Sequence, residues 1–207
     1  DPETIRRIVR PITSQPWVMI VAGVIMGGMM PLLEELMKPL AMWGIAIRRP
    51  TLEQGLVMGL LCGAAFAFWE SSNNLAMTDT SSWVSLVIGR TGTGILHTVN
   101  SGLVGLGFAA AWTKQRYLWM IGLYLFSSLA HGIWNTLVIL DANSDMVGFS
   151  STVLAQRFPM VSSLIPVALV VLILILLGVL ILVNFFLQRN GRDTLIKNDD
   201  VADAASS

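Results

Sequence analysis

Two adjacent carboxylates and an ammonium lie inside a long apolar segment near the N-terminus. Glu34, Glu35 and Lys38 interrupt a mostly apolar stretch that runs from Trp17 to Ile47. A charged side chain at the centre of a bilayer costs from ~2.5 to ~15 kcal/mol, so such charges normally face a bundle interior, pair with one another and mark function. On a helix, Lys38 lies one turn from both glutamates and can reach either carboxylate. The alternative is a turn at the membrane interface, where all three side chains would lie in water.

Composition places the chain among polytopic membrane proteins. Of its 207 residues, 54% are hydrophobic and only 13% are charged, which is far from the average of soluble domains. The net charge is zero, so no basic surface argues for a nucleic-acid partner. The single cysteine, Cys62, can form neither an internal disulfide nor a multi-cysteine zinc site, and we expect a small buried hydrophobe. Because the chain begins at Asp1 and not at methionine, we expect a processed or trimmed product.

The hydrophobic pattern predicts an all-α fold, a polytopic bundle of about five transmembrane helices with four core helices around a polar site. Pro31 predicts a kink in the first span, and the fifth span carries no chemistry and is interpreted as an anchor. An amphipathic arm at the membrane surface is expected before the membrane domain, and a polar, disordered tail after it. The predicted boundaries are 1–16 for the arm, 17–188 for the membrane domain with spans at 17–47, 53–75, 83–112, 117–140 and 160–188, and 189–207 for the tail.

Small residues recur at four-residue intervals on the second and third spans. Such a stripe lets a neighbouring helix approach closely, so it predicts tight packing of these two spans. The stripes consist of Gly55, Gly59, Gly63 and Ala67 on the second span and Ser101, Gly105 and Ala109 on the third.

An ionisable residue occurs at a similar depth in each of the first four spans. Glu34, Glu70, His97 and His131 each lie ~20 to 26 Å from the membrane face that carries the loops after the first and third spans, at ~1.5 Å per helical residue. Unrelated polar residues are rarely tolerated at this depth, so the coincidence predicts one shared site and argues against the interfacial turn. Further polar residues on the same helical faces either support this site or link helices by hydrogen bonds. They are Asn73, Asn74, Arg90, Asn100 and Asn135.

Basic residues predict the orientation in the membrane. Seven lie on the side of the C-terminus against five on the other side, so we expect the C-terminus to be cytoplasmic and the polar cluster to lie in the extracytoplasmic half of the bilayer. The seven are Arg48, Arg49, Lys114, Arg116, Arg189, Arg192 and Lys197, and the five are Arg6, Arg7, Arg10, Arg90 and Arg157.

Four motifs on successive spans resemble those of the PrsW intramembrane proteases, within the wider group that includes the type II CAAX prenyl endopeptidases. In the prenyl endopeptidases the second motif has histidine in place of Glu70, so the chain is more similar to the PrsW branch. The resemblance covers about Leu32 to Asn135. The motifs are Glu34-Glu35-x-x-Lys38, Phe66-x-x-x-Glu70 followed by asparagines, His97 preceded by Arg90 and followed by glycines, and His131-x-x-x-Asn135.

This resemblance implies an integral protein of a prokaryotic cell membrane that hydrolyses a peptide bond of a membrane-anchored protein, such as an anti-sigma factor, near the extracytoplasmic boundary. Its partners would be this substrate and membrane lipid. Glu34 would be the general base, with Glu35 positioning it or the water, and Lys38 would keep one glutamate ionised. The resemblance also implies that Glu70, His97, His131 and Asn135 complete the catalytic site, supported by Asn73, Asn74, Arg90 and Asn100.

A metal-dependent site is the main chemical alternative. Glu35, Glu70, His97 and His131 could hold zinc, although the chain has no His-Glu-x-x-His motif. We favour a metal-free mechanism with a glutamate-activated water, and therefore expect no cofactor.

Two functions without proteolysis also fit intramembrane charge. A proton-coupled transporter uses buried glutamate and histidine, but the chain shows no convincing internal repeat of the kind that many transporters contain. A catalytically silent scaffold could bind a partner's transmembrane helix, and the presence of every motif residue argues against it.

Overall fold

The computed structural model describes residues 15–39, 50–76, 83–142 and 159–206, together with Thr4, Ile8 and Pro11. Within these residues the chain is helical and forms no strand, which confirms the predicted all-α class. The arm predicted over 1–16 lies almost entirely outside the described residues, as do 40–47 of the first predicted span. The elements are α2 (Pro16–Val24), the π-helical turn η1 (Ile25–Met29), α3 (Met30–Met37), α5 (Leu52–Ala76), α6 (Trp83–Lys114), α7 (Tyr117–Ala142) and α9 (Pro159–Ser206).

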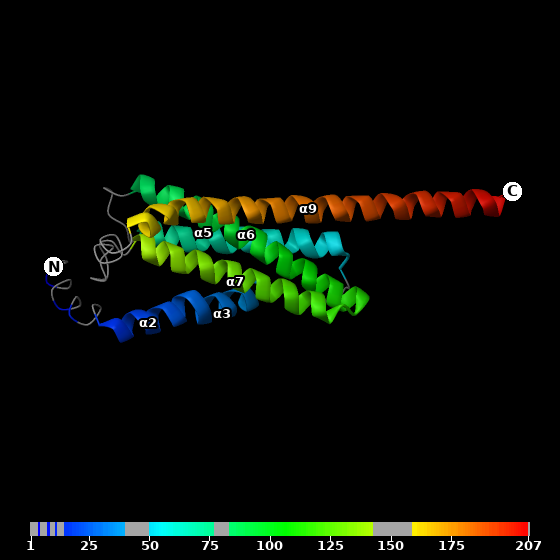
Figure 1. Cartoon of the computed structure of the whole chain (residues 1–207). Helices are drawn as coiled ribbons and strands as arrows, with labels where there is room; N and C mark the ends of the chain where they lie inside the picture. The colour runs from blue at the N-terminus through cyan, green and yellow to red at the C-terminus, as the bar shows by residue number, and fades with distance from the viewer. Residues whose placement is uncertain are drawn as a thin grey trace.

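Five stretches are long and apolar enough to cross a membrane, as the sequence predicted. They are Ile20–Met37, which combines α2, η1 and α3, and then Leu52–Leu75, Val87–Lys114, Tyr117–Leu140 and Ser163–Arg189. Large apolar side chains such as Phe68 and Leu118 are mostly exposed, which suits a surface that faces lipid. Figure 1 shows the helices running side by side, with the start of α5, the α6–α7 connection and the C-terminal part of α9 toward one end.

Helix α6 is the centre of the bundle. Of the residues in an apolar 18-residue stretch of α6, 83% are buried, against 28% in the corresponding stretch of α5 and 33% in that of α7. The neighbouring helices therefore surround α6. Leu96 and Leu103 of α6 are fully buried beside Ala130 of α7 and Leu176 of α9. Most of α9 is exposed along its apolar length, and it packs against α6 and α7 from outside, like the anchor that the sequence predicted.

The small-residue stripes of α5 and α6 face each other. A Cβ atom added at Gly59 would collide with the backbone of Ser101, and one added at Gly63 would collide with the backbone of His97. The two backbones therefore touch, and no side chain larger than hydrogen fits between them. Because Gly63 lies two turns before Glu70 on the same helix, this contact also sets the position of Glu70 relative to His97.

We expect Gly59→Ala to destabilise the protein by about 1–3 kcal/mol, because the added methyl group forces two backbones apart. The matched control is Gly122→Ala in α7, where an added Cβ meets no atom within 4 Å. That control should keep or raise stability, since alanine is the better helix former. Thermal unfolding of the purified protein in detergent measures both, and equal melting temperatures would contradict the contact.

The break predicted near Pro31 is a π-helical turn just before it. The N–H of Met30 bonds to the carbonyl of Ile25, five residues earlier, so the carbonyl of Met26 is the next that needs a donor. In a continued π-helical turn, this carbonyl would accept from the residue five positions later, but that residue is Pro31, which has no N–H. The amide of Asn135 supplies the donor instead, with Nδ2 2.9 Å from the oxygen of Met26. A residue that the resemblance placed in the catalytic site thus holds the break in the first span.

Helix α7 contacts the first span at two further points. The backbones of Gly27 and Gly132 approach so closely that a Cβ at either would collide with the other chain segment. Farther along both segments, the hydroxyl of Tyr124 donates a hydrogen bond of 2.8 Å to the carbonyl of Leu32. These contacts fix the height and rotation of the segment that carries the two adjacent glutamates.

Helix α9 continues to Ser206, whereas the sequence predicted a disordered tail over 189–207. This segment contains no proline and only one glycine, Gly191, and its Ala, Leu and Lys residues are compatible with a helix. A polar composition excludes burial of a segment, but it does not exclude a helix that continues from a membrane span.

Candidate active site

Ionisable side chains from four spans meet in one cluster inside the bundle. Glu35 is fully buried and Lys38 is 8% exposed, so the interfacial turn considered above is wrong. His97 and His131 are buried too, and their rings meet edge to face with centroids 4.8 Å apart. The cluster consists of Glu34, Glu35 and Lys38 at the end of α3, Glu70 of α5, Arg90 and His97 of α6, and His131 of α7.

Glu35 links the first span to α7. Its Oε1 atom accepts a hydrogen bond from Nζ of Lys38 at 2.6 Å and lies 2.9 Å from Nδ1 of His131. A proton on Nδ1 satisfies this second contact and leaves the lone pair of Nε2 free. Because Glu35 is fully enclosed and paired with an ammonium, it suits the positioning role predicted for it better than contact with water.

Lys38 places a fixed cation at the centre of the cluster. Besides Glu35, its Nζ lies 2.8 Å from Nδ1 of His97 and 4.0 Å from Oε2 of Glu34. The same ammonium stands 4.7 Å from the centre of the Phe66 ring, a cation–π contact. A tautomer of His97 with its proton on Nε2 accepts from Lys38 through Nδ1.

Glu70 forms a hydrogen bond with Nε2, the second ring nitrogen of His97. Its Oε2 atom lies 2.9 Å from Nε2 of His97, and the same carboxylate pairs with the guanidinium of Arg90. Arg90 also donates through Nε to the hydroxyl of Ser71 at 3.1 Å. A continuous chain of charged and hydrogen-bonded groups therefore runs from Arg90 through Glu70, His97, Lys38 and Glu35 to His131.

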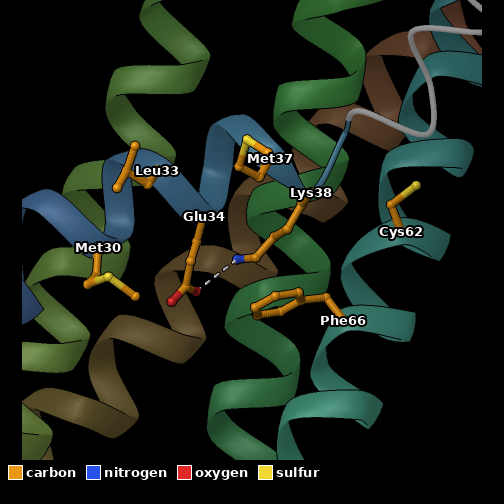
Figure 2. Close-up of a pocket in the computed structure, with 7 residues that line it drawn as sticks. All are labelled: Met30, Leu33, Glu34, Met37, Lys38, Cys62 and Phe66. Atoms are coloured by element: carbon orange, nitrogen blue, oxygen red, sulfur yellow. Dashed lines mark ion pairs between the residues drawn. The ribbon is translucent and has the colours of Figure 1, made fainter.

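Glu34 is the carboxylate of the cluster that lines a pocket. Its Oε2 atom has no hydrogen-bond partner among the described residues and lies 3.8 Å from Nε2 of His131. The pocket has a volume of about 370 Å³. Figure 2 shows Glu34 and Lys38 reaching into it from the end of α3, with Phe66 of α5 beside them. The remaining lining residues are Met30, Leu33, Met37 and Cys62.

The asparagines predicted on the motif faces bond to backbone carbonyls. Asn100 of α6 and Ser127 of α7 exchange two hydrogen bonds, of 3.0 and 3.2 Å, that join the helices. Asn73 and Asn74 donate to carbonyls one turn earlier in α5. Asn100 and Asn135 therefore join neighbouring helices, whereas these bonds of Asn73 and Asn74 lie within α5.

Several contributors escaped the sequence prediction, and three of them show what the sequence could signal. Ser71 supports Arg90, and Met30 and Met37 line the pocket beside Glu34. A signal existed for the methionines, because they lie four residues before and three residues after Glu34 and so share its helical face. No comparable signal pointed to Ser71.

Three residues offer donors of the kind that zinc takes. Atoms of Glu34, His97 and His131 lie within 4.8 Å of one another, and a set of two histidines and one glutamate is common in zinc enzymes. The sequence had proposed Glu35 and Glu70 instead, but these are bound to Lys38 and Arg90. In the present arrangement both nitrogens of His97 are also engaged, and an ammonium lies among the donors. A metal ion bound by these three residues would therefore have to displace the ammonium of Lys38 or the carboxylate of Glu70 from His97.

A comparison with protein families gives one finding. The family model described as PrsW family intramembrane metalloprotease matches residues 5–180. No curated protein and no solved structure matches the chain. The matched region contains all four polar spans and every residue of the buried cluster. This chain is therefore a member of the PrsW family and an intramembrane protease.

Proposed function

We propose that Glu34 and His131 activate the water that cleaves a peptide bond of a membrane-anchored protein. One observation carries this proposal. Oε2 of Glu34 and Nε2 of His131 are 3.8 Å apart, and when Nδ1 of His131 donates to Glu35 both are acceptors without a donor between them. A water molecule that donates one O–H to each satisfies both groups and directs its lone pairs toward the pocket.

The charge of the cluster favours proton uptake from this water. Glu34, Glu35 and Glu70 face two permanent cations, Lys38 and Arg90, so the cluster carries one negative charge when both histidines are neutral. An uncompensated charge is costly at membrane depth. Transfer of a proton from water to Glu34 moves this negative charge onto the attacking oxygen and then onto the oxyanion, beside the ammonium of Lys38, so the carboxylate can act as general base without adding charge to the site.

Lys38 is the group best placed to stabilise the oxyanion that forms when water attacks. An ammonium has three N–H donors, and two are used by Glu35 and His97. The third remains for the pocket, which Lys38 also lines. The resemblance placed Asn135 in the catalytic site as well, but its amide donates to the carbonyl of Met26. A preorganised donor in a low-dielectric site contributes strongly to such catalysis.

The substrate class follows from the family and from the depth of the cluster. We take the substrate to be a membrane-anchored regulator such as an anti-sigma factor, as the resemblance implies. With the C-terminus cytoplasmic, the cluster that contains Glu34 lies toward the outer surface of a hydrocarbon layer ~30 Å thick, because its member Glu70 is ~25 Å along α5 from the cytoplasmic start of that helix. A bond in a loop or frayed helix end is easier to attack there, since an intact helix keeps its carbonyls hydrogen-bonded.

The test is to incubate the purified protein in lipid bilayers with single-span reporter proteins and to locate the new termini by mass spectrometry. We expect cleavage within a few residues of the reporter's outer membrane boundary. A cut on the cytoplasmic side would refute the orientation, and no cut in any reporter would count against proteolysis by this cluster.

A second experiment decides the role of metal. Because both nitrogens of His97 are engaged by Lys38 and Glu70, we expect exhaustive chelation to leave the cleavage rate unchanged. Loss of activity on chelation, recovery on adding zinc, and one tightly bound ion per chain would together show a metal enzyme. A soluble zinc protease treated in the same detergent serves as the control for complete chelation.

A further inference from the structure

The pocket beside Glu34 has walls that are apolar and adaptable. Five of its lining residues come from α3 and its last turn, and Cys62 and Phe66 come from α5 one helical turn apart (Figure 2). Apart from Glu34 and Lys38, each lining side chain is apolar or a thiol. Methionine fills irregular spaces because it is unbranched and polarisable, so walls formed by Met30 and Met37 can fit side chains of several shapes.

The size and exposure of the pocket limit what can enter. Its volume of about 370 Å³ is near the lower end of the ~300–1,000 Å³ typical of ligand sites, and an α-helix with its side chains is ~10–12 Å wide. An intact transmembrane helix is too wide, whereas one large side chain with extended backbone fits. Met37 is 55% exposed and Leu33 48% exposed, so the pocket rim belongs to the lipid-facing surface.

We propose that this pocket binds one large apolar side chain of the substrate, of the leucine, methionine or phenylalanine class, next to the scissile bond. The substrate segment enters sideways from the bilayer between α3 and α5, in extended form. This inference rests on the proposed function, because the pocket matters through its carboxylate, Glu34. An acidic side chain would be rejected, since it would bring a second unpaired charge beside Glu34.

Cleavage of matched reporters tests the specificity. Single-span reporters that differ at one position, with Leu, Phe, Ala or Asp, are compared by kcat/KM in bilayers, and the Leu and Phe reporters should be cleaved best. Cys62→Phe narrows the pocket and should lower kcat/KM for the Phe reporter by about 10–200-fold more than for the Ala reporter. The matched control is Leu61→Phe, because Leu61 is the neighbouring residue, is 65% exposed and does not line the pocket. Equal effects of the two variants would overturn the proposal.

Binding is measured separately through Cys62, the single cysteine of the chain. In a Glu34→Gln background, which slows turnover, N-ethylmaleimide should alkylate Cys62. With the Leu reporter at about ten times its Kd, alkylation should slow about tenfold, as mass action requires for an occupied pocket. The Asp reporter should give no protection, because burying a carboxylate among the apolar walls is costly even without the charge of Glu34. Protection by lipid alone, with no dependence on the reporter, would overturn the proposal and identify the occupant as an acyl chain.

The two readouts separate the two proposals. Protection of Cys62 without any cleavage by the unmodified protein would leave the pocket assignment standing and refute the proposed function. Cleavage that ignores the side chain at the varied position, with no protection of Cys62, would refute the pocket and leave the function standing.

Discussion

Replacing Glu34 with glutamine is expected to lower the rate of cleavage by about 10²–10⁴-fold, because an amide cannot take a proton from water. Glutamine has nearly the same shape, and the carboxylate that it replaces makes no hydrogen bond through Oε2 among the described residues. The protein should therefore stay folded in the membrane with an unchanged melting temperature. Initial rates on a membrane-anchored reporter measure the effect, and Glu53→Gln at the exposed start of α5 is the matched control.

His131→Ala should cause a loss of similar size, since it removes the second acceptor for the water. The two groups act on one water molecule, so the double variant should be little worse than either single variant. Additive losses would show that Glu34 and His131 act at different steps, and undiminished cleavage by Glu34→Gln would refute the assignment of the base.

Lys38→Met should lower the free energy of unfolding by about 3–5 kcal/mol, because it leaves Glu35 as a buried, uncompensated charge. The two side chains are 1% and 0% exposed and lie 2.6 Å apart, so water cannot replace the lost ammonium. Activity should fall with stability, since the ammonium also faces the pocket. Chemical or thermal unfolding in detergent measures the change, with Lys114→Met at the exposed end of α6 as the control.

A double variant separates charge from packing. Glu35→Gln combined with Lys38→Met removes both charges, and we expect it to recover much of the stability lost by Lys38→Met alone. If the double variant is as unstable as the sum of the single variants, the loss comes from shape and the ion pair is not its cause.

Much of this architecture could be predicted, because it follows from the free-energy cost of charge at membrane depth and from the spacing of small residues along a helix. Charges at membrane depth must meet, and Glu35, Lys38 and His131 do so across α3 and α7. Glycines at four-residue intervals must face a close neighbour, and Gly59 lies against the backbone of Ser101. Each pattern can be recognised within single spans of the sequence, and each leaves one arrangement of the helices with low free energy.

The partners of individual polar side chains could not be predicted in the same way. Asn135 was predicted to belong to the catalytic site, and the contact that its amide makes is a hydrogen bond to the carbonyl of Met26. That carbonyl needs a donor only because the first span contains a π-helical turn, which neither hydrophobicity nor motif spacing reveals. The metal-ligand set predicted from the sequence meets a related limit. Spacing shows that Glu35 and Glu70 share a depth with the histidines, but it does not show that Lys38 and Arg90 already bind them.

The π-helical turn at Ile25–Met29 has a consequence for how the two glutamates are aimed. A π-helical turn accommodates one residue more than an α-helical turn, and one residue corresponds to ~100° of helical rotation. The angular phase of Glu34 and Glu35 relative to α2 is therefore set by a residue count about two turns away from them. Of these two glutamates, Glu34 lines the pocket and Glu35 pairs with the buried Lys38. Which of the two glutamates lines the pocket and which pairs with Lys38 thus depends on the one extra residue of a π-helical turn outside the site.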